Sequence, residues 1–308
     1  MSAIRIGVVG IGKIARDQHL PAIASDSSFE LVACASRNAN VAGVANYADI
    51  SAMLAGEPRI DAVAICTPPQ AHFRDARSAL RAGKHVLLEK PPTKSLSEFR
   101  ELVDEAVRAE RTLFQTWHSR FAAGVMPART WLTGRRILSG RVSWKEDVRK
   151  WHPGQTWIWE PGGFGVFDPG INALSILTLL APSLTLQRAV LEVPSNCQAP
   201  IAADLTLTTT DGAAIQAEFD FRQTHGETWE IEIVTDSGAL RLTRGGAEAC
   251  SDEATLTPPS HLGEYPALYG RFAELVRGRE SDTDARPFEL VADAFMIGER
   301  RETEAFHP

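Results

Sequence analysis

From Ile4 to Ala15 the chain reads IRIGVVGIGKIA, a short apolar run followed by a glycine turn and the start of a helical pattern. The turn has the spacing G-x-G-x-x-G/A, with Gly10 and Gly12 in the two glycine places and Ala15 in the third. Gly10 permits a tight turn, and Gly12 lets the backbone approach a pyrophosphate with no side chain in between. The helix that follows presents free N–H groups to phosphate oxygens. Because the run Phe29–Ala35 then closes a βαβ unit, the stretch predicts a dinucleotide site.

The first 120 residues alternate short apolar runs with helical patterns, which is typical of a parallel sheet covered by helices. The runs are rich in Val, Ile and Leu, as expected for strands buried on both faces. They are Ile4–Val9, Phe29–Ala35, Ala62–Cys66, His85–Leu88 and Thr112–Thr116. One helix is predicted to stop at Gly83, and another starts where Ser95 and Glu98 have capping-box spacing. We therefore expect an N-terminal α/β domain, a doubly wound Rossmann sheet over residues 1–120.

Residues 121–308 have longer segments with period-two patterning, which predicts a mainly antiparallel, open sheet. The predicted strands are Asp204–Thr210, Ala213–Phe221, Trp229–Thr235 and Ala239–Thr243, with a strand-like run at Arg141–Trp151. Asp211-Gly212 and Ser237-Gly238 are expected hairpin turns, and helical patterns return at Pro266–Gly278 and Pro287–Arg301. This half is predicted to be an α+β domain that binds substrate. Its open sheet is a candidate surface for a homodimer.

The end of the second strand indicates which nicotinamide cofactor is used. Enzymes specific for NAD usually place an acid there for the ribose 2′-hydroxyl, whereas a 2′-phosphate calls for a cation. Here the strand is followed by Ser36 and Arg37, and no acid occurs before Asp49. We expect NADP, with NAD as the weaker alternative. Residues Ile11, Lys13 and Ile14 of the glycine turn complete the predicted contacts in this region.

Composition excludes several other functions. The 308 residues carry a net charge of −7, and neither nucleic acid nor an anionic membrane is expected to bind an acidic surface. No apolar run is long enough to span a bilayer, and no signal peptide precedes the first strand, so a cytoplasmic location is expected. The four cysteines have no Cys-x-x-Cys spacing, and the eight histidines form no metal motif, so metal catalysis is not expected.

Further motifs carry a family resemblance. The chain contains Cys66-Thr67-Pro68-Pro69 with His72, then Glu89-Lys90-Pro91, and later Gly162-Gly163 followed by Asp168-Pro169-Gly170. Together with the glycine turn, these motifs resemble the glucose–fructose oxidoreductase / inositol dehydrogenase family over essentially the whole chain. The resemblance implies cofactor contacts from Cys66, Thr67, Pro68, His72, Glu89 and Lys90. It extends to members that oxidise C1 of L-arabinose or D-galactose, which implies a sugar 1-dehydrogenase that makes an aldonolactone.

The predicted catalytic residues are Lys90, Asp168 and Asn172. Lys90 follows a strand at the carboxyl edge of the parallel sheet, where ligands of open α/β sheets bind. Asp168 and Asn172 are four residues apart at the start of a helix, hence on one face. The family pattern often has His where Asn172 stands, and an amide cannot exchange a proton at neutral pH. We expect Lys90 and Asp168 to meet at the nicotinamide. Either Lys90 is the base with Asp168 as hydroxyl acceptor, or Asp168 takes the proton and Lys90 stabilises the alkoxide.

Four side chains near the glycine-rich stretch are candidates for substrate binding: Glu146, His152, His118 and Trp151. Carboxylate and imidazole groups suit vicinal hydroxyls, and an indole suits the apolar face of a pyranose. Trp157 and Trp159 are expected to pack the loop, and Trp229 to fill the second sheet.

Two alternatives stay open from the sequence. One is another member of the same family that acts on a different polyol or sugar, such as inositol, glucose or xylose. The other is a non-catalytic NADP-sensing regulator, which would have no use for Lys90 and Asp168.

Overall fold

The computed structural model describes residues 2–307 and divides the chain into two compact units. The first unit comprises Met1–Trp117 and Leu262–Asp284, and the second comprises His118–His261 and Ala285–Pro308. This differs from the predicted division at residue 120, because the segment containing helix α8 (Glu264–Gly278) returns to the first unit. The return is driven by aromatic packing: the ring of Tyr269 lies 5.3 Å from that of Phe29, edge to face.

The first unit contains a six-stranded sheet in the order β3-β2-β1-β4-β5-β6, and all of its strand pairs are parallel. The strands are β1 (Ile4–Val9), β2 (Phe29–Ala35), β3 (Ala45–Tyr47), β4 (Ala62–Ile65), β5 (His85–Leu88) and β6 (Leu113–Gln115). The predicted doubly wound Rossmann domain is confirmed. Only β3, an edge strand of three residues, was not expected from the sequence pattern.

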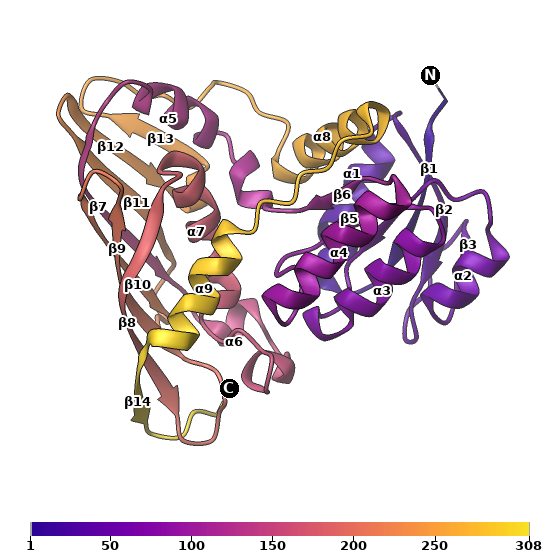
Figure 1. The fold of residues 1–308 in the computed structure, drawn as a ribbon, viewed down its shortest axis with the longest axis horizontal. Coiled ribbons are helices and arrows are strands. Elements are labelled where there is room, and N and C mark those ends of the chain that lie inside the picture. Colours follow the sequence, from indigo (N-terminus) through magenta and orange to yellow (C-terminus); the bar gives the residue numbers. More distant parts are fainter. Residues whose placement is uncertain (1, 308) are drawn as a thin grey trace. The chain divides into compact units, whose positions relative to one another are not determined.

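The helices of this unit are η1 (Ala15–His19), α1 (Leu20–Ser25), α2 (Ile50–Gly56), α3 (Pro69–Arg81), α4 (Leu96–Ala109) and α8. Helices α3 and α4 lie side by side over the sheet (Figure 1). As predicted, Ser95 caps α4, with its Oγ accepting from the N–H of Glu98 at 3.4 Å, and Gly83 takes a left-handed φ of 71° after α3. Segment η1 is a turn of π-helix that continues into α1.

The second unit contains an eight-stranded sheet in the order β13-β12-β11-β7-β10-β9-β8-β14. The strands are β7 (Ile137–Lys145), β8 (Leu184–Pro194), β9 (Ala202–Thr209), β10 (Ala214–Asp220), β11 (Thr228–Thr235), β12 (Gly238–Thr243), β13 (Glu248–Ser251) and β14 (Glu299–Thr303). All neighbours are antiparallel except β7–β10 and β8–β14. Both predicted hairpin turns are confirmed, with φ of 84° at Gly212 and 116° at Gly238.

Helices α5 (Val125–Leu132), α7 (Phe167–Leu180) and α9 (Arg286–Ile297) lie on one face of this sheet (Figure 1). The short helices η2 (His118–Phe121), α6 (Val148–Trp151), η3 (Thr156–Trp159) and η4 (Arg244–Gly246) complete the unit. The other face carries charged side chains in rows, such as Glu218, whose carboxylate contacts Arg141 at 2.6 Å and Lys145 at 2.8 Å.

Two boundaries in the second unit correct the sequence analysis. The predicted strand-like run Arg141–Trp151 ends at Lys145, because Asp147 starts helix α6 by accepting from the N–H of Arg149 at 2.9 Å. The predicted helix Pro287–Arg301 ends at Ile297, because the next residue, Gly298, has extended backbone and leads into β14.

Within residues 2–307, every helix is too short or too polar to span a bilayer. A cytoplasmic location stays a prediction.

Candidate active site

The glycine turn follows β1 at the carboxyl edge of the parallel sheet. Gly10 has a φ of 89°, and a Cβ there would lie 2.7 Å from the carbonyl carbon of Cys66 and from the nitrogen of Thr67. No side chain fits this position, since the turn packs directly on the backbone that follows β4. At Gly12, by contrast, a Cβ would have nothing within 4 Å, so this part of the turn borders open space. The pair therefore fits a bound dinucleotide, whose pyrophosphate needs close access to the backbone.

Arg37 follows the second strand and is exposed. No ion pair to its guanidinium occurs within the part of the chain that the structure describes, so no carboxylate there competes for it. The neighbouring Ser36 is half-buried and its N–H donates to the carbonyl of Tyr47 at 2.9 Å, which fixes the end of the strand. An exposed cation at this strand end fits a 2′-phosphate.

Other predicted cofactor residues occupy the same edge with different exposure. Lys13 pairs with Asp17 on the surface, Ile14 is exposed and Ile11 is buried, so Ile11 could reach a cofactor only through its backbone. Pro68 is exposed. Burial raises the pKa of the Cys66 thiol well above its usual value, which keeps that side chain protonated.

His72, another predicted cofactor residue, has two partners within its own unit. Its imidazole is completely buried, with Nδ1 2.9 Å from the carbonyl oxygen of Pro91 and Nε2 2.5 Å from that of Thr67. Burial lowers the pKa of His72, and the two carbonyls partly oppose that effect. The ring therefore joins the loop after β4 to the loop after β5, and its contact with a cofactor stays a prediction.

Lys90 lies just after β5, at the predicted sheet edge, and is half-buried. The Lys90–Pro91 peptide bond is cis. The backbone N–H of Lys90 donates to Glu89 Oε2 at 2.8 Å. The side chain of Glu89 is only 4% exposed and is turned inward, so its predicted contact with the cofactor could come only from the backbone.

In the second unit, His152 stands between two buried carboxylates. Its Nε2 is 3.4 Å from Glu146 Oε1, and its Nδ1 is 3.6 Å from Asp168 Oδ2. Glu146 is 3% exposed and Asp168 is 4% exposed. The indole N–H of Trp229 donates to Glu146 Oε2 at 3.0 Å. We call these four residues, with Asn172, the polar cluster.

Asp168 and Asn172 lie one turn apart in the first half of α7, as the sequence predicted. Among residues 2–307, neither Asn172 Oδ1 nor His152 Nδ1 has a hydrogen-bond partner, although both atoms are buried. A buried polar atom left without a partner is costly, so such atoms indicate a polar ligand. One acceptor and one ring nitrogen beside two carboxylates suit hydroxyl groups, which both donate and accept.

The glycine-rich stretch before α7 is required by close backbone contacts. A Cβ at Gly163 would lie 2.4 Å from the carbonyl oxygens of Trp157 and Ile158. At Gly165 it would lie 2.2 Å from the oxygen of Pro200, and φ there is 52°. These contacts set where α7 begins and hence where Asp168 lies.

Two tryptophans lie at the polar cluster. Trp229 was expected to fill the second sheet; it stacks on Trp144 with ring centres 6.1 Å apart, and its indole N–H also donates to Glu146. Its place could have been inferred, because it shares the parity of the buried residues Ile231 and Ile233 and so faces the helix-covered side. Trp151 is 36% exposed, donates to Glu227 at 3.0 Å and packs on Trp229 with ring centres 5.2 Å apart.

The fourth substrate candidate, His118, lies in η2, with its Nδ1 3.4 Å from Ser119 Oγ. Its contact with a substrate stays a prediction.

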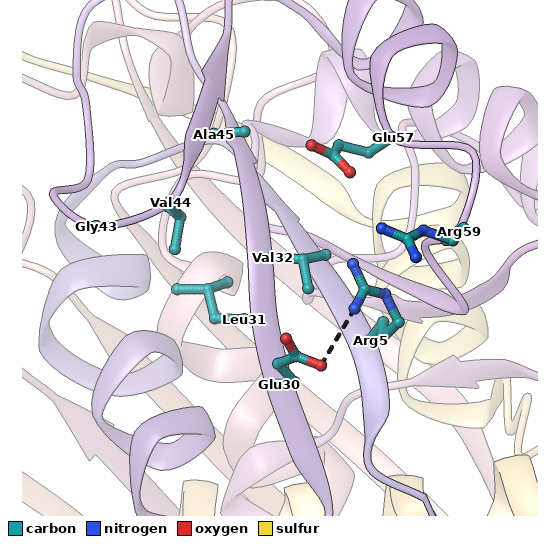
Figure 2. A pocket seen from close by; sticks show the side chains of 9 residues that line it. All are labelled: Arg5, Glu30, Leu31, Val32, Gly43, Val44, Ala45, Glu57 and Arg59. Atoms are coloured by element: carbon teal, nitrogen blue, oxygen red, sulfur yellow. Dashed lines mark hydrogen bonds and ion pairs between the residues drawn. The ribbon is translucent and has the colours of Figure 1, made fainter.

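A hollow of about 540 Å³ lies at the opposite, amino edge of the Rossmann sheet (Figure 2). It is lined by residues that include Arg5, Glu30, Glu57 and Arg59, and Arg5 Nη1 is 3.3 Å from Glu30 Oε2. Ligands of open α/β sheets bind at the carboxyl edge, so this hollow is not where the cofactor is expected.

Comparison with known proteins agrees with this fold and these motifs. Residues 4–116 match the family described as "Oxidoreductase family, NAD-binding Rossmann fold". A galactose 1-dehydrogenase of Pseudomonas fluorescens is 46% identical over 308 residues, which is 100% of both chains. The solved structure of a D-galactose-1-dehydrogenase from Rhizobium etli is 51% identical, with a TM-score of 0.95 over 100% of this chain and 99% of that one.

A more distant structure shares the fold alone. It is a 3-ketoreductase from Actinomadura kijaniata in complex with NADP and TDP-benzene, 23% identical, with a TM-score of 0.84 over 98% of this chain and 99% of that one. The 46% identity to the first relative over the full length, together with the match to the Rossmann-fold family, shows the family of the chain. It belongs to the glucose–fructose oxidoreductase / inositol dehydrogenase family of oxidoreductases with an NAD-binding Rossmann fold.

Proposed function

We propose that the chain is an aldose 1-dehydrogenase that uses NADP in preference to NAD. It oxidises the anomeric carbon of D-galactose, and of L-arabinose, to the aldonolactone. Two relatives that match its full length are named for galactose 1-dehydrogenation. L-Arabinose is included because its pyranose has the same hydroxyl configuration as D-galactose and lacks only the group on C5.

The polar cluster is the observation that carries this proposal. Two carboxylates, one imidazole and one amide lie together within the second unit, and two of their buried atoms have no hydrogen-bond partner among the described residues. Such a set would bind several hydroxyls of one sugar, while the indoles of Trp229 and Trp151 offer apolar surface to a pyranose face. A ligand with a single polar group would leave most of the cluster unsatisfied.

The reaction removes a proton from the C1 hydroxyl, and the nicotinamide, when bound, accepts the hydride. We assign the proton to Lys90, at the carboxyl edge beside the glycine turn. Asp168 accepts a hydrogen bond from a sugar hydroxyl, and Asn172 orients the sugar by donating and accepting. His152 and Glu146 bind further hydroxyls. The reverse assignment, in which Asp168 takes the proton and Lys90 stabilises the alkoxide, is the alternative that kinetics must separate.

The preference for NADP rests on Arg37, an exposed cation where enzymes specific for NAD place an acid. The open space at Gly12 serves either cofactor equally.

We also propose that the face of the eight-stranded sheet that α5, α7 and α9 do not cover joins two copies of the chain. The charged rows of this face, with Glu218 between Arg141 and Lys145, could pair with those of a second copy. Light scattering coupled to size exclusion tests the dimer directly, and a monomeric mass at micromolar concentration would refute it.

The decisive experiment is NADP reduction with a panel of free aldoses and inositols. D-Galactose and L-arabinose are expected to give the highest kcat/KM, with an aldonolactone as the product. Faster turnover of an inositol or of glucose would assign the chain to another activity of its family. Binding of NADP without turnover of any sugar would favour a sensor.

A further inference from the structure

Four buried side chains of the first unit meet next to Lys90: His19, Glu89, Tyr265 and Tyr269. Glu89 Oε1 accepts from the hydroxyl of Tyr265 at 2.8 Å and lies 3.0 Å from His19 Nε2. The other ring nitrogen, Nδ1, is 2.8 Å from the hydroxyl of Tyr269. No side chain of the four has a role in the proposed reaction, yet together they form a buried, hydrogen-bonded network next to its catalytic lysine. We call them the Glu89 cluster.

The donors and acceptors of the Glu89 cluster fit one protonation pattern. Burial and the nearby carboxylate raise the pKa of Tyr265 well above its usual value, and burial does the same for Tyr269, so both keep their protons. Tyr265 donates to Glu89. If Tyr269 donates to His19 Nδ1, then His19 carries its proton on Nε2 and donates to Glu89. Every contact then joins one donor to one acceptor, and the carboxylate is ionised.

The second carboxylate oxygen of Glu89 has a different partner. Glu89 Oε2 accepts from the backbone N–H of Lys90 at 2.8 Å. One oxygen is thus held by side chains from elsewhere in the unit, and the other holds the main chain of the catalytic lysine. A carboxylate with both oxygens engaged cannot rotate, so it fixes where the Lys90 backbone lies.

The partners of Glu89 come from segments far apart in sequence. His19 ends η1, a turn of π-helix that begins three residues after Gly12, and the N–H of Leu20 bonds back to the carbonyl of Ala15. Single π-turns inside α-helices are often found at functional sites. The turn buries His19 completely. Tyr265 and Tyr269 lie on α8, and the rings of His19 and Tyr265 pack edge to face at 4.9 Å.

We propose that Glu89 is a positioning residue for Lys90, and that His19 and Tyr265 hold its carboxylate in place. The inference rests on the proposed function, in which Lys90 acts on the C1 hydroxyl. The Glu89 cluster would then hold together three segments of the first unit: η1 after the glycine turn, α8, and the loop after β5 that contains Lys90. Displacing a catalytic group by about 1 Å can lower the rate roughly 100-fold.

Glu89→Gln is the sharpest variant because it keeps the shape of the side chain. An amide has one acceptor oxygen, but donors approach Glu89 from both sides. Whichever way the amide turns, its NH2 group faces either the N–H of Lys90 or the donors His19 and Tyr265. We expect kcat with D-galactose to fall roughly 10- to 100-fold. The dissociation constant for NADP and the KM for galactose should stay within about threefold of the wild-type values, because neither ligand loses a contact.

The same substitution in a Lys90→Met background separates positioning from a general loss of structure. If Glu89 acts through Lys90, Glu89→Gln should change the residual rate of Lys90→Met less than about twofold. The matched control is Glu105→Gln, which alters another buried carboxylate of this unit. Glu105 lies on α4, its carboxylate is 3.0 Å from Arg81 of α3, and its substitution should leave kcat unchanged.

Three results would overturn the inference: wild-type kcat in a folded Glu89→Gln protein, an equal loss of rate in the Lys90→Met background, or wild-type kcat in Lys90→Met itself. The last result would also remove the proposed role of Lys90, whereas the first two leave the proposed function intact. If Glu89→Gln does not fold, as judged by its melting curve and NADP binding, the inference is tested with Tyr265→Phe instead. It keeps the carboxylate and removes one donor, so kcat should fall roughly 3- to 10-fold, again only when Lys90 is present.

Discussion

Replacing Arg37 by alanine should change which nicotinamide cofactor the chain prefers. A hydrogen bond to a charged group contributes about 1.5–3 kcal/mol, and the exposure of Arg37 places the effect toward the lower end. A loss of roughly 2 kcal/mol corresponds to a decrease of about 30-fold in affinity for NADP. NAD has no 2′-phosphate to lose, so its affinity should change less than about twofold.

The assay is the KM of each cofactor at saturating D-galactose, together with dissociation constants measured without sugar by fluorescence titration. Arg59→Ala is the matched control, because Arg59 is an exposed arginine of the same unit that lines the hollow at the amino edge of the sheet (Figure 2). It should leave both cofactors unaffected. Equal weakening of NADP and NAD by Arg37→Ala, or less than about a threefold loss for NADP, would refute the role of this residue.

Three further predictions follow from named contacts. Gly12→Val should abolish cofactor binding with little change in melting temperature, since its Cβ enters open space, whereas Gly10→Ala should destabilise the protein by roughly 1–3 kcal/mol because of its positive φ and backbone contacts. Burial lowers the pKa of His85 to about 4, against about 6.5 unfolded, so the unfolded chain binds more protons between these values. The free energy of unfolding should therefore fall by roughly 1–2 kcal/mol between pH 6.5 and pH 4, a figure reduced for the partial exposure of the ring. Trp229→Phe removes the donor to Glu146 and should raise the KM for galactose roughly 5- to 20-fold.

Each of these predictions has a clear counter-result. Normal NADP affinity in Gly12→Val would place the pyrophosphate elsewhere. An unfolding free energy with the same pH dependence in His85→Gln as in the wild type would remove His85 as the cause. An unchanged KM for galactose in Trp229→Phe, measured alongside Trp157→Phe as a control, would show that the polar cluster does not bind the sugar.

Most of the fold could be predicted because its strands and turns are specified by residues that are close together in the sequence. Strands β1, β2 and β5 are mainly apolar runs whose observed limits equal the predicted ones, and the hairpins at Gly212 and Gly238 were marked by their turn residues. Strand β3 was not predicted because its three residues, one exposed and two half-exposed, are too few to show a periodic pattern. The return of α8 to the first unit could not be foreseen, because an amphipathic helix does not specify which sheet its apolar face will cover.

The candidate site divides in the same way. The glycine turn, Lys90 and the pair Asp168–Asn172 could be proposed from sequence because they belong to local motifs. The other members of the polar cluster come from distant elements: His152 follows α6, and Trp229 lies on β11. Sequence spacing cannot bring such residues together, since tertiary packing decides which side chains meet.

The Glu89 cluster shows the same limit more strongly. Its carboxylate and its partner Tyr265 are separated by 176 residues, and His19 lies on a π-helical turn that no sequence pattern predicts. The Glu-Lys-Pro motif marked the position but not the buried network that holds it.

The most direct measurement is the initial rate of galactose-dependent NADP reduction by the wild type, Lys90→Met, Asp168→Asn and the double variant, with NADP binding measured in parallel. Each single change should lower kcat by roughly 100-fold or more while NADP still binds. The kcat of the double variant should be little lower than that of the less active single variant, because the effects of residues that serve one reaction step are not additive. Galactose oxidation at the wild-type rate in both single variants would show that neither residue takes part in the chemistry.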